Sequence, residues 1–148
     1  ENDTVTVDGN KISLPSDFTY ILFNKPKGCV CTANDEKGRK TIFDFINLSN
    51  KRLFSVGRLD YDSEGMLILT NDGELSYRLT HPSNEIPKTY VVKIEGQIQE
   101  DQLAKLRNTL ELPGGGVSHH AKVKVLETFK DSTRLQVTIY EGKNRQIT

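Results

Sequence analysis

The sequence predicts an α+β fold with a mixed, mainly antiparallel sheet and a few helices on its faces. Two observations support this prediction: short apolar runs of strand length recur along the chain, and Gly, Pro, Asn and Asp residues separate them. Runs with helical spacing are fewer and shorter, which argues against an all-helical protein. A chain of 148 residues is long enough for one domain with a sizeable core.

Composition excludes several classes of protein. Hydrophobic residues make up 35% and charged residues 27% of the chain, and no apolar run approaches the roughly 18 residues that span a membrane. Residues 1–4 lack the basic start and apolar centre of a signal peptide, so a cytoplasmic protein is expected. No residue pattern indicates self-association, and we expect a monomer.

The first elements are predicted to form a hairpin. Thr4–Val7 and Lys11–Leu14 flank an Asp8-Gly9 turn, which is a dipeptide typical of tight hairpins. Pro15-Ser16-Asp17 has the composition of a linker. The main domain is therefore expected to start at Phe18.

The main domain is predicted to alternate strands with short helices. Lys25-Pro26-Lys27-Gly28 forms a turn after the first strand, because Pro fixes one φ and Gly permits the next reversal. Branched and aromatic residues between turn signals predict the strands Tyr20–Phe23, Val30–Thr32, Leu53–Val56, Met66–Thr70, Thr89–Ile94, Ala121–Thr128 and Leu135–Tyr140.

Helices are predicted where apolar residues recur at helical spacing or where cap signals occur. They are expected at Thr41–Ile46, at Glu74–Thr80, at Ile98–Leu110 and from Arg145 onward. The second of these follows the cap sequence Asn71-Asp72-Gly73, and His81-Pro82 ends it.

The cysteines and histidines form no recognisable metal site. Cys29 and Cys31 are expected inside a strand with their side chains on one face, and no further thiols complete a metal site. His81, His119 and His120 lack the spacing of a metal-binding motif. Structural cysteines and solvated or capping histidines are the favoured interpretation.

Lysines and arginines concentrate in one part of a chain that has no net charge. Residues 20–60 hold eight Lys and Arg residues against four Asp and Glu residues. Clustered cations contact nucleic-acid phosphates, although on charge alone a solvated loop surface is favoured. The cations concerned are Lys25, Lys27, Lys37, Arg39, Lys40, Lys51, Arg52 and Arg58.

The strongest candidate for chemistry lies between two apolar runs, in residues 57–65. Arg58 and Asp60 are two positions apart, so in extended backbone they share a face. The run Asp60–Gly65 also resembles the start of an EF-hand calcium loop. Its twelfth position is Asn71 in place of Glu, and Met66–Thr70 has strand character, so calcium binding is disfavoured.

Several separated segments together resemble one family, and they occur in that family's order. The segments are Tyr20-Ile-Leu-Phe-Asn-Lys-Pro-Lys-Gly28, Gly57-Arg-Leu-Asp60, Gly65-Met-Leu-Ile-Leu-Thr-Asn-Asp-Gly-Glu-Leu75, Lys88-Thr-Tyr90 and Glu141-Gly-Lys-Asn-Arg-Gln146. Residues 18–148 resemble the pseudouridine synthases of the RsuA/RluB/RluE/RluF type. The resemblance implies the pseudouridine synthase catalytic fold.

The resemblance also implies a division of the chain. Residues 1–17 would be the tail of an N-terminal S4-like RNA-binding module and a linker, and residues 18–148 would be the catalytic domain. The family usually continues with Arg-Arg-Met after the last motif, so the catalytic domain is expected to be truncated at its C-terminus.

The activity implied by the resemblance is isomerisation of a uridine in ribosomal RNA, with no cofactor and no metal. Asp60 matches the family's catalytic aspartate, which acts on a flipped-out nucleotide as a nucleophile or by assisting proton abstraction. Arg145 matches a basic residue that would pair with this carboxylate, and an arginine facing solvent is the alternative.

Other residues match positions that would contact the RNA. Tyr90 matches the active-site tyrosine, which stacks on the target base and is a candidate acid or base at carbon 5. An ordinary core aromatic is the alternative. Arg58 matches the arginine that supports the flipped nucleotide, with a phosphate contact as the alternative. Lys25, Lys27 and Lys88 are assigned to the RNA backbone.

Two further classes of function stay open at this point. A non-catalytic RNA-binding module would share the basic residues without needing Asp60, Tyr90 and Arg145 together. A calcium-binding or other metal-binding protein would be stabilised by its ion. The run Asp62-Ser63-Glu64 and Met66 depart from the family's usual residues, but neither removes a catalytic group.

Overall fold

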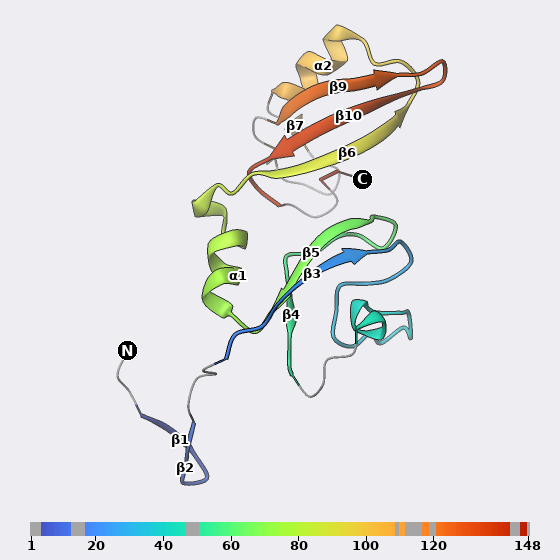
Figure 1. Ribbon diagram of the computed structural model, residues 1–148. Helices are drawn as coiled ribbons and strands as arrows, with labels where there is room; N and C mark the ends of the chain where they lie inside the picture. Colours follow the sequence, from blue (N-terminus) through green and yellow to red (C-terminus); the bar gives the residue numbers. More distant parts are fainter. Residues whose placement is uncertain are drawn as a thin grey trace. The chain divides into compact units, whose positions relative to one another are not determined.

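The computed structural model describes residues 4–12, 17–46, 51–108, 110–111, 117–118, 121–142 and 146–147 (Figure 1). The chain divides into two compact units, residues 1–77 and residues 78–148. None of the helices described is long and apolar enough to cross a membrane.

The predicted α+β class with mainly antiparallel sheets is confirmed. In the described part of the chain, the named strands pair antiparallel, and the parallel contact is the isolated bridge between Val30 and Thr41. Two α-helices accompany the strands, one starting in the first unit and one in the second.

The N-terminal hairpin is formed by β1 (Val5–Val7) and β2 (Asn10–Ile12). Asp8 and Gly9 both have positive φ angles, 48° and 78°. Two positive φ angles in a two-residue loop match the right-handed twist of the flanking strands. The predicted hairpin is confirmed. Pro15 and Ser16 of the predicted linker lie outside the described residues, so the domain boundary there stays a prediction.

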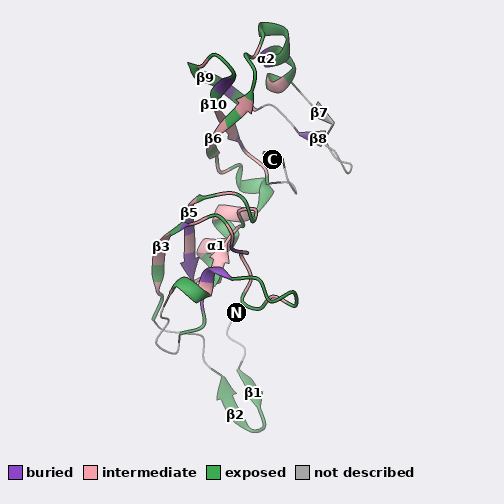
Figure 2. Ribbon diagram, turned by 90° about the vertical axis from the view of Figure 1, so that its right-hand side faces the viewer, coloured by how far each residue is buried: buried purple, intermediate pink, exposed green. Residues whose placement is uncertain are grey.

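A three-stranded sheet organises the rest of the first unit. Its order is β3 (Tyr20–Lys25), β5 (Gly65–Thr70) and β4 (Phe54–Val56). One face packs on a core of apolar side chains, to which the 3₁₀ helix η1 (Ile42–Phe45) contributes Ile42. Figure 2 shows buried residues on the central strand β5. The buried members of this core are Cys29, Ile42, Leu53, Leu67 and Leu69.

The opposite face of this sheet is exposed and partly apolar. Leu22 on β3 and Met66 on β5 are each 70% exposed. Because strand side chains alternate between faces, Ile21 and Phe23 point to the core while Leu22 points away from it. The sheet therefore has one packed face and one face open to solvent in the described residues.

The helix α1 (Gly73–Thr80) follows β5 directly, as the cap sequence predicts. The Asp72 carboxylate accepts a hydrogen bond from the Leu75 N–H at 2.9 Å, which satisfies a free donor of the first turn. The short 3₁₀ helix η2 (Pro82–Asn84) is capped by His81, whose side chain accepts a hydrogen bond from the Ser83 N–H. The prediction of a capping histidine is confirmed at His81, whereas His119 and His120 lie outside the described residues.

The second unit contains a three-stranded sheet in the order β6 (Lys88–Glu95), β10 (Ser132–Ile139) and β9 (Lys122–Thr128). The helix α2 (Glu100–Arg107) buries Leu103 against Val123 and Leu135 of this sheet. The two-residue strands β7 (Leu110–Glu111) and β8 (Val117–Ser118) pair with each other.

Several predicted strands differ from the structure by one to three residues at their ends, such as the last sheet strand, which begins at Ser132 instead of Leu135. Two predicted elements differ more seriously. The predicted strand Val30–Thr32 is wrong, because only Val30 is bridged and it pairs with Thr41 instead of a sheet strand. The predicted helix Ile98–Leu110 is too long, since α2 ends at Arg107 and Leu110 belongs to β7. The start of the predicted C-terminal helix, Arg145, lies outside the described residues.

Candidate active site

Asp60 lies on the turn that joins β4 to β5. The Ser63 N–H donates to the Asp60 carbonyl at 3.1 Å, which closes the turn, and the Asp60 residue is half-buried. The sequence predicts a presented carboxylate between two strands, and the structure puts Asp60 on the connection between β4 and β5.

Lys25 holds this turn from the core side. The side chain is fully buried, at 0% exposure, and its ammonium donates to the carbonyls of Asp60 at 2.9 Å and Ser63 at 2.8 Å. A third hydrogen bond goes to the Pro26 carbonyl at 3.1 Å. The three donors of the ammonium are thus matched by three carbonyl oxygens. The RNA contact expected of Lys25 does not agree with this burial, and its role is internal.

Two further residues of the segment 25–31 hold the neighbouring carbonyls. The Gly28 N–H donates to the Tyr61 carbonyl at 2.8 Å, and the Cys31 thiol donates to the Leu59 carbonyl at 3.3 Å. The carbonyls of three consecutive residues, 59, 60 and 61, are therefore each held by a different donor of one short segment. Gly28 has φ +79°, a conformation that favours glycine at this close approach.

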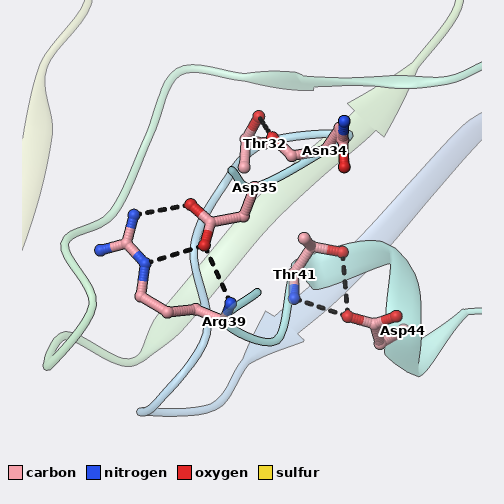
Figure 3. A network of polar contacts seen from close by, with 6 residues as sticks. All are labelled: Thr32, Asn34, Asp35, Arg39, Thr41 and Asp44. Carbon is pink, nitrogen blue, oxygen red and sulfur yellow. Dashed lines mark hydrogen bonds and ion pairs between the residues drawn. The ribbon is translucent and has the colours of Figure 1, made fainter. Parts of the chain in front are cut away.

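The loop that follows Cys31 is ordered by a second set of polar contacts (Figure 3). The Arg39 guanidinium donates to both carboxylate oxygens of Asp35, at 2.7 Å and 3.1 Å, and the Arg39 N–H adds a third bond at 2.9 Å. Hydrogen bonds from the Arg39 side chain and main chain lower the pKa of Asp35 to about 2. The loop therefore has a fixed anion at its centre.

The end of the same loop is fixed by the cap of η1. The Thr41 N–H and hydroxyl both donate to the Asp44 carboxylate, at 2.6 Å and 3.2 Å (Figure 3). The Phe43 N–H donates in turn to the Thr41 hydroxyl at 3.3 Å. This reciprocal pattern is a capping box. It anchors the loop to the core through Ile42, which is fully buried.

The other residues assigned to RNA differ in exposure. Arg58 and Lys27 are exposed, as a contact with a phosphate requires. Lys88 is half-buried at the start of β6, and its ammonium donates to the Ile86 carbonyl at 3.1 Å. The Lys88 ammonium has three N–H donors, and this hydrogen bond uses one of them.

Tyr90 belongs to the second unit and lies on β6. It pairs in register with Val137 of β10 and shares a face with Val92 and Ile94, which pack on the core under α2. The tyrosine itself is half-buried, so its position at the end of this apolar row suits both a core role and an exposed hydroxyl.

Arg145 lies outside the described residues, so its predicted pairing with Asp60 stays a prediction. Its neighbour Gln146 is described, and the Gln146 amide donates to the Ser118 hydroxyl at 2.7 Å and to the Glu141 carboxylate at 2.9 Å. Two residues of the last motif are thus fixed to each other and to β8.

The internal role of Lys25 has a signal in the sequence. Ile21, Phe23 and Lys25 are two residues apart along β3, so strand alternation puts all three on the core face. The contact of Cys31 with Leu59 has no such signal, because it joins residues 28 positions apart outside any strand pairing. In the described part of the chain no group of three His, Cys, Asp or Glu residues could hold a metal ion.

Comparison with known proteins identifies the family. The profile of the family described as RNA pseudouridylate synthase matches residues 19–148, which is most of the chain. The chain belongs to the RNA pseudouridylate synthase family. The resemblance of the five sequence segments to this family is therefore confirmed.

Curated relatives of this pseudouridine synthase family member are similar along nearly the whole chain. The chain is 40% identical over 147 residues to ribosomal large subunit pseudouridine synthase B of Bacillus subtilis, covering 99% of this chain and 60% of that protein. It is 42% identical over 141 residues to ribosomal large subunit pseudouridine synthase E of Vibrio parahaemolyticus, covering 86% of this chain and 58% of the relative.

A solved structure shares the fold. A crystal structure of a pseudouridylate synthase matches with a TM-score of 0.80 and 32% sequence identity, covering 93% of this chain and 57% of that one. The expected pseudouridine synthase fold is thereby confirmed. The chain spans about 60% of the length of the first curated relative, so the activity of the whole protein is a matter for proposal.

Proposed function

We propose that this member of the pseudouridine synthase family isomerises a uridine of ribosomal RNA to pseudouridine, with Asp60 as the catalytic carboxylate. The observation that carries the proposal is the support of the Asp60 turn, whose three consecutive carbonyls are held by Lys25, Gly28 and Cys31. A catalytic side chain that stands on a main chain fixed before the substrate arrives has less freedom to lose during the reaction. The names of the relatives, which specify the ribosomal large subunit, support ribosomal RNA as the substrate class.

The proposed reaction needs no co-reactant, because uridine and pseudouridine are isomers. The bond from N1 of uracil to C1′ of the ribose breaks, the uracil turns, and C5 bonds to C1′. C5 then loses its proton while N1 gains one, so atoms and charges balance. Asp60 acts either as a nucleophile or by assisting proton abstraction from the sugar, and both routes use the ionised carboxylate.

The ionised form of Asp60 requires a cation when RNA excludes water from the site. Burial alone favours the neutral acid, whereas a nearby guanidinium favours the carboxylate. We assign this cation to Arg145, which belongs to the last family motif. Two parallel hydrogen bonds from a guanidinium to a carboxylate would fix both the charge and the direction of Asp60.

The remaining site residues are proposed to handle the target nucleotide. Taking a base out of the RNA stack costs a few kcal/mol, and the exposed Arg58, two residues before Asp60, would support the flipped nucleotide. Tyr90 would stack on the uracil and exchange the C5 proton. Lys27 and Lys88 would contact phosphates, and Lys25 is left out of this set because it is fully buried.

The proposal is tested by tritium release from ribosomal RNA labelled at carbon 5 of uracil. The chain is compared with Asp60→Asn and with the matched control Asp62→Asn, which removes an exposed carboxylate two residues away. Thermal unfolding of all three proteins shows whether each is folded. We expect release by the parent and by Asp62→Asn, and none by Asp60→Asn.

Other outcomes have distinct meanings. Release by Asp60→Asn at the parental rate would show that this carboxylate is not catalytic. Absence of release from every protein, with RNA binding retained, would favour a non-catalytic RNA-binding module. Repeating the assay with a chain extended to the length of the relatives would then separate that function from a requirement for further segments.

A further inference from the structure

Cys31 makes a reciprocal contact with the residue before Asp60. Its thiol donates to the Leu59 carbonyl at 3.3 Å and accepts from the Leu59 N–H at 3.4 Å. One side chain thus holds both polar groups of a single main-chain residue. Because the peptide between residues 59 and 60 includes the Leu59 carbonyl, its orientation is set in part by Cys31.

The residues packed around Cys31 hold its side chain in place beside Leu59. The residue packs against the buried core of the first unit and is itself half-buried, so its side chain has a fixed support on one side. The neighbouring carbonyls of Asp60 and Tyr61 are held by Lys25 and Gly28. If the Cys31 thiol is removed, the turn keeps these two hydrogen bonds. It loses only the contacts with Leu59, the residue that precedes Asp60.

We propose that Cys31 is a positioning residue that fixes the Leu59 main chain and thereby the direction of the Asp60 carboxylate. The proposal rests on the proposed function, since it matters for the reaction only if Asp60 is catalytic. The contact with the turn is a separate property, and it is measurable without substrate.

Cys29 provides a matched control in the same part of the fold. It is fully buried in the same core, two residues away, and its thiol donates to the Pro26 carbonyl at 3.4 Å instead of to the turn. Cys29→Ala and Cys31→Ala each remove one sulfur atom that packs in or against this core. If Cys31 had only a structural role, the two substitutions would lower activity to a similar extent, in proportion to the stability that each one costs.

The experiment measures amide hydrogen exchange at Leu59, and kcat and KM for ribosomal RNA, in Cys31→Ala, Cys31→Ser and Cys29→Ala. We expect Leu59 exchange to rise about tenfold in Cys31→Ala, because the N–H loses its acceptor. We expect kcat to fall about tenfold in the same variant with KM within about twofold, because misplacement of a catalytic group acts on the chemical step. Cys31→Ser keeps a donor and an acceptor and should restore most of both values, while Cys29→Ala should change neither.

Each alternative result has one reading. Unchanged Leu59 exchange in Cys31→Ala would overturn the proposal, and so would an equal fall of kcat in the two alanine variants. Faster exchange with unchanged kcat, while Asp60→Asn is inactive, would also overturn it. If Asp60→Asn is fully active, the proposed function fails, whereas the exchange rate at Leu59 still decides whether Cys31 holds the turn.

Discussion

The ammonium nitrogen of Lys25 lies 2.9 Å from the carbonyl oxygen of Asp60 and is fully buried. A buried cation thus contacts the main chain of the residue whose carboxylate we propose to be catalytic. The contact ties the end of β3 to the turn between β4 and β5, so that the core of the first unit supports the candidate site.

Replacing Lys25 by Met should destabilise the first unit strongly. The change removes the donor that the carbonyls of Pro26, Asp60 and Ser63 share, although the first two keep hydrogen bonds from the Cys29 thiol and the Ser63 N–H. A buried carbonyl that loses its partner costs about 1–3 kcal/mol, so we expect a loss of about 2 kcal/mol. Urea denaturation measures the loss. Lys27→Met, at an exposed position two residues away, should change the free energy of unfolding by less than about 0.5 kcal/mol. Equal midpoints for the two variants would refute a structural role of Lys25.

The contribution of Asp35 to stability should depend on pH in the acid range. Its hydrogen bonds with Arg39 lower its pKa from the usual 3.8 to about 2, so the folded protein favours the carboxylate. The stabilisation is complete above pH 4 and disappears as pH falls through about 2. The difference in free energy of unfolding between the parent and Asp35→Asn should therefore shrink between pH 4 and pH 2. A difference that stays constant over this range would show that the ion pair does not contribute.

The Asp72 carboxylate serves two partners, and its removal should affect both. It accepts from the Leu75 N–H at 2.9 Å and from the Tyr20 hydroxyl at 2.8 Å. Asp72→Ala should cost about 1 kcal/mol, because α1 loses its cap. The hydrogen bond to Asp72 also raises the pKa of Tyr20, so that pKa should fall toward its usual value in the variant. Absorbance titration of tyrosine measures the fall, and Tyr20→Phe identifies the group that titrates.

The two cysteines should differ in reactivity toward iodoacetamide. Cys29 is fully buried, and burial raises the pKa of its thiol, whereas Cys31 is half-buried. Since the thiolate is the reactive form, Cys31 should be alkylated at least about tenfold faster in the folded protein. Fragmentation of the labelled peptide by mass spectrometry separates the two sites. In urea the difference should vanish, and persistence of the difference there would point to a cause other than burial.

The strands and helices with strong local signals could be predicted from the sequence. Apolar runs between turn residues predict β5 and β3, and the cap residues before Gly73 predict α1 almost to the residue. The predicted strand at Val30–Thr32 failed because branched residues favour strands only where a partner strand lies beside them. Val30 instead bridges to Thr41, across a loop in which Arg39 forms an ion pair with Asp35.

The candidate site could be predicted in part. The position of Asp60 between two strands follows from local sequence, whereas its support by Lys25 and Cys31 depends on contacts between residues 28 or more positions apart. The expectation that Lys25 contacts RNA was based on the positive charge of its side chain. Strand alternation puts Lys25 on the same face as Ile21 and Phe23, and therefore indicates that its side chain is buried. The burial is possible because three carbonyl oxygens accept hydrogen bonds from the ammonium.

The three donors of the segment 25–31 also constrain its length. They come from positions 25, 28 and 31 and reach the carbonyls of residues 60, 61 and 59, so one inserted or deleted residue would separate at least one donor from its acceptor. Exchanges of residue type are far less restricted by this turn at Asp62 and Glu64, whose side chains are exposed. Natural or engineered variants can therefore replace these two carboxylates and keep the turn, provided that the number of residues in the segment is kept.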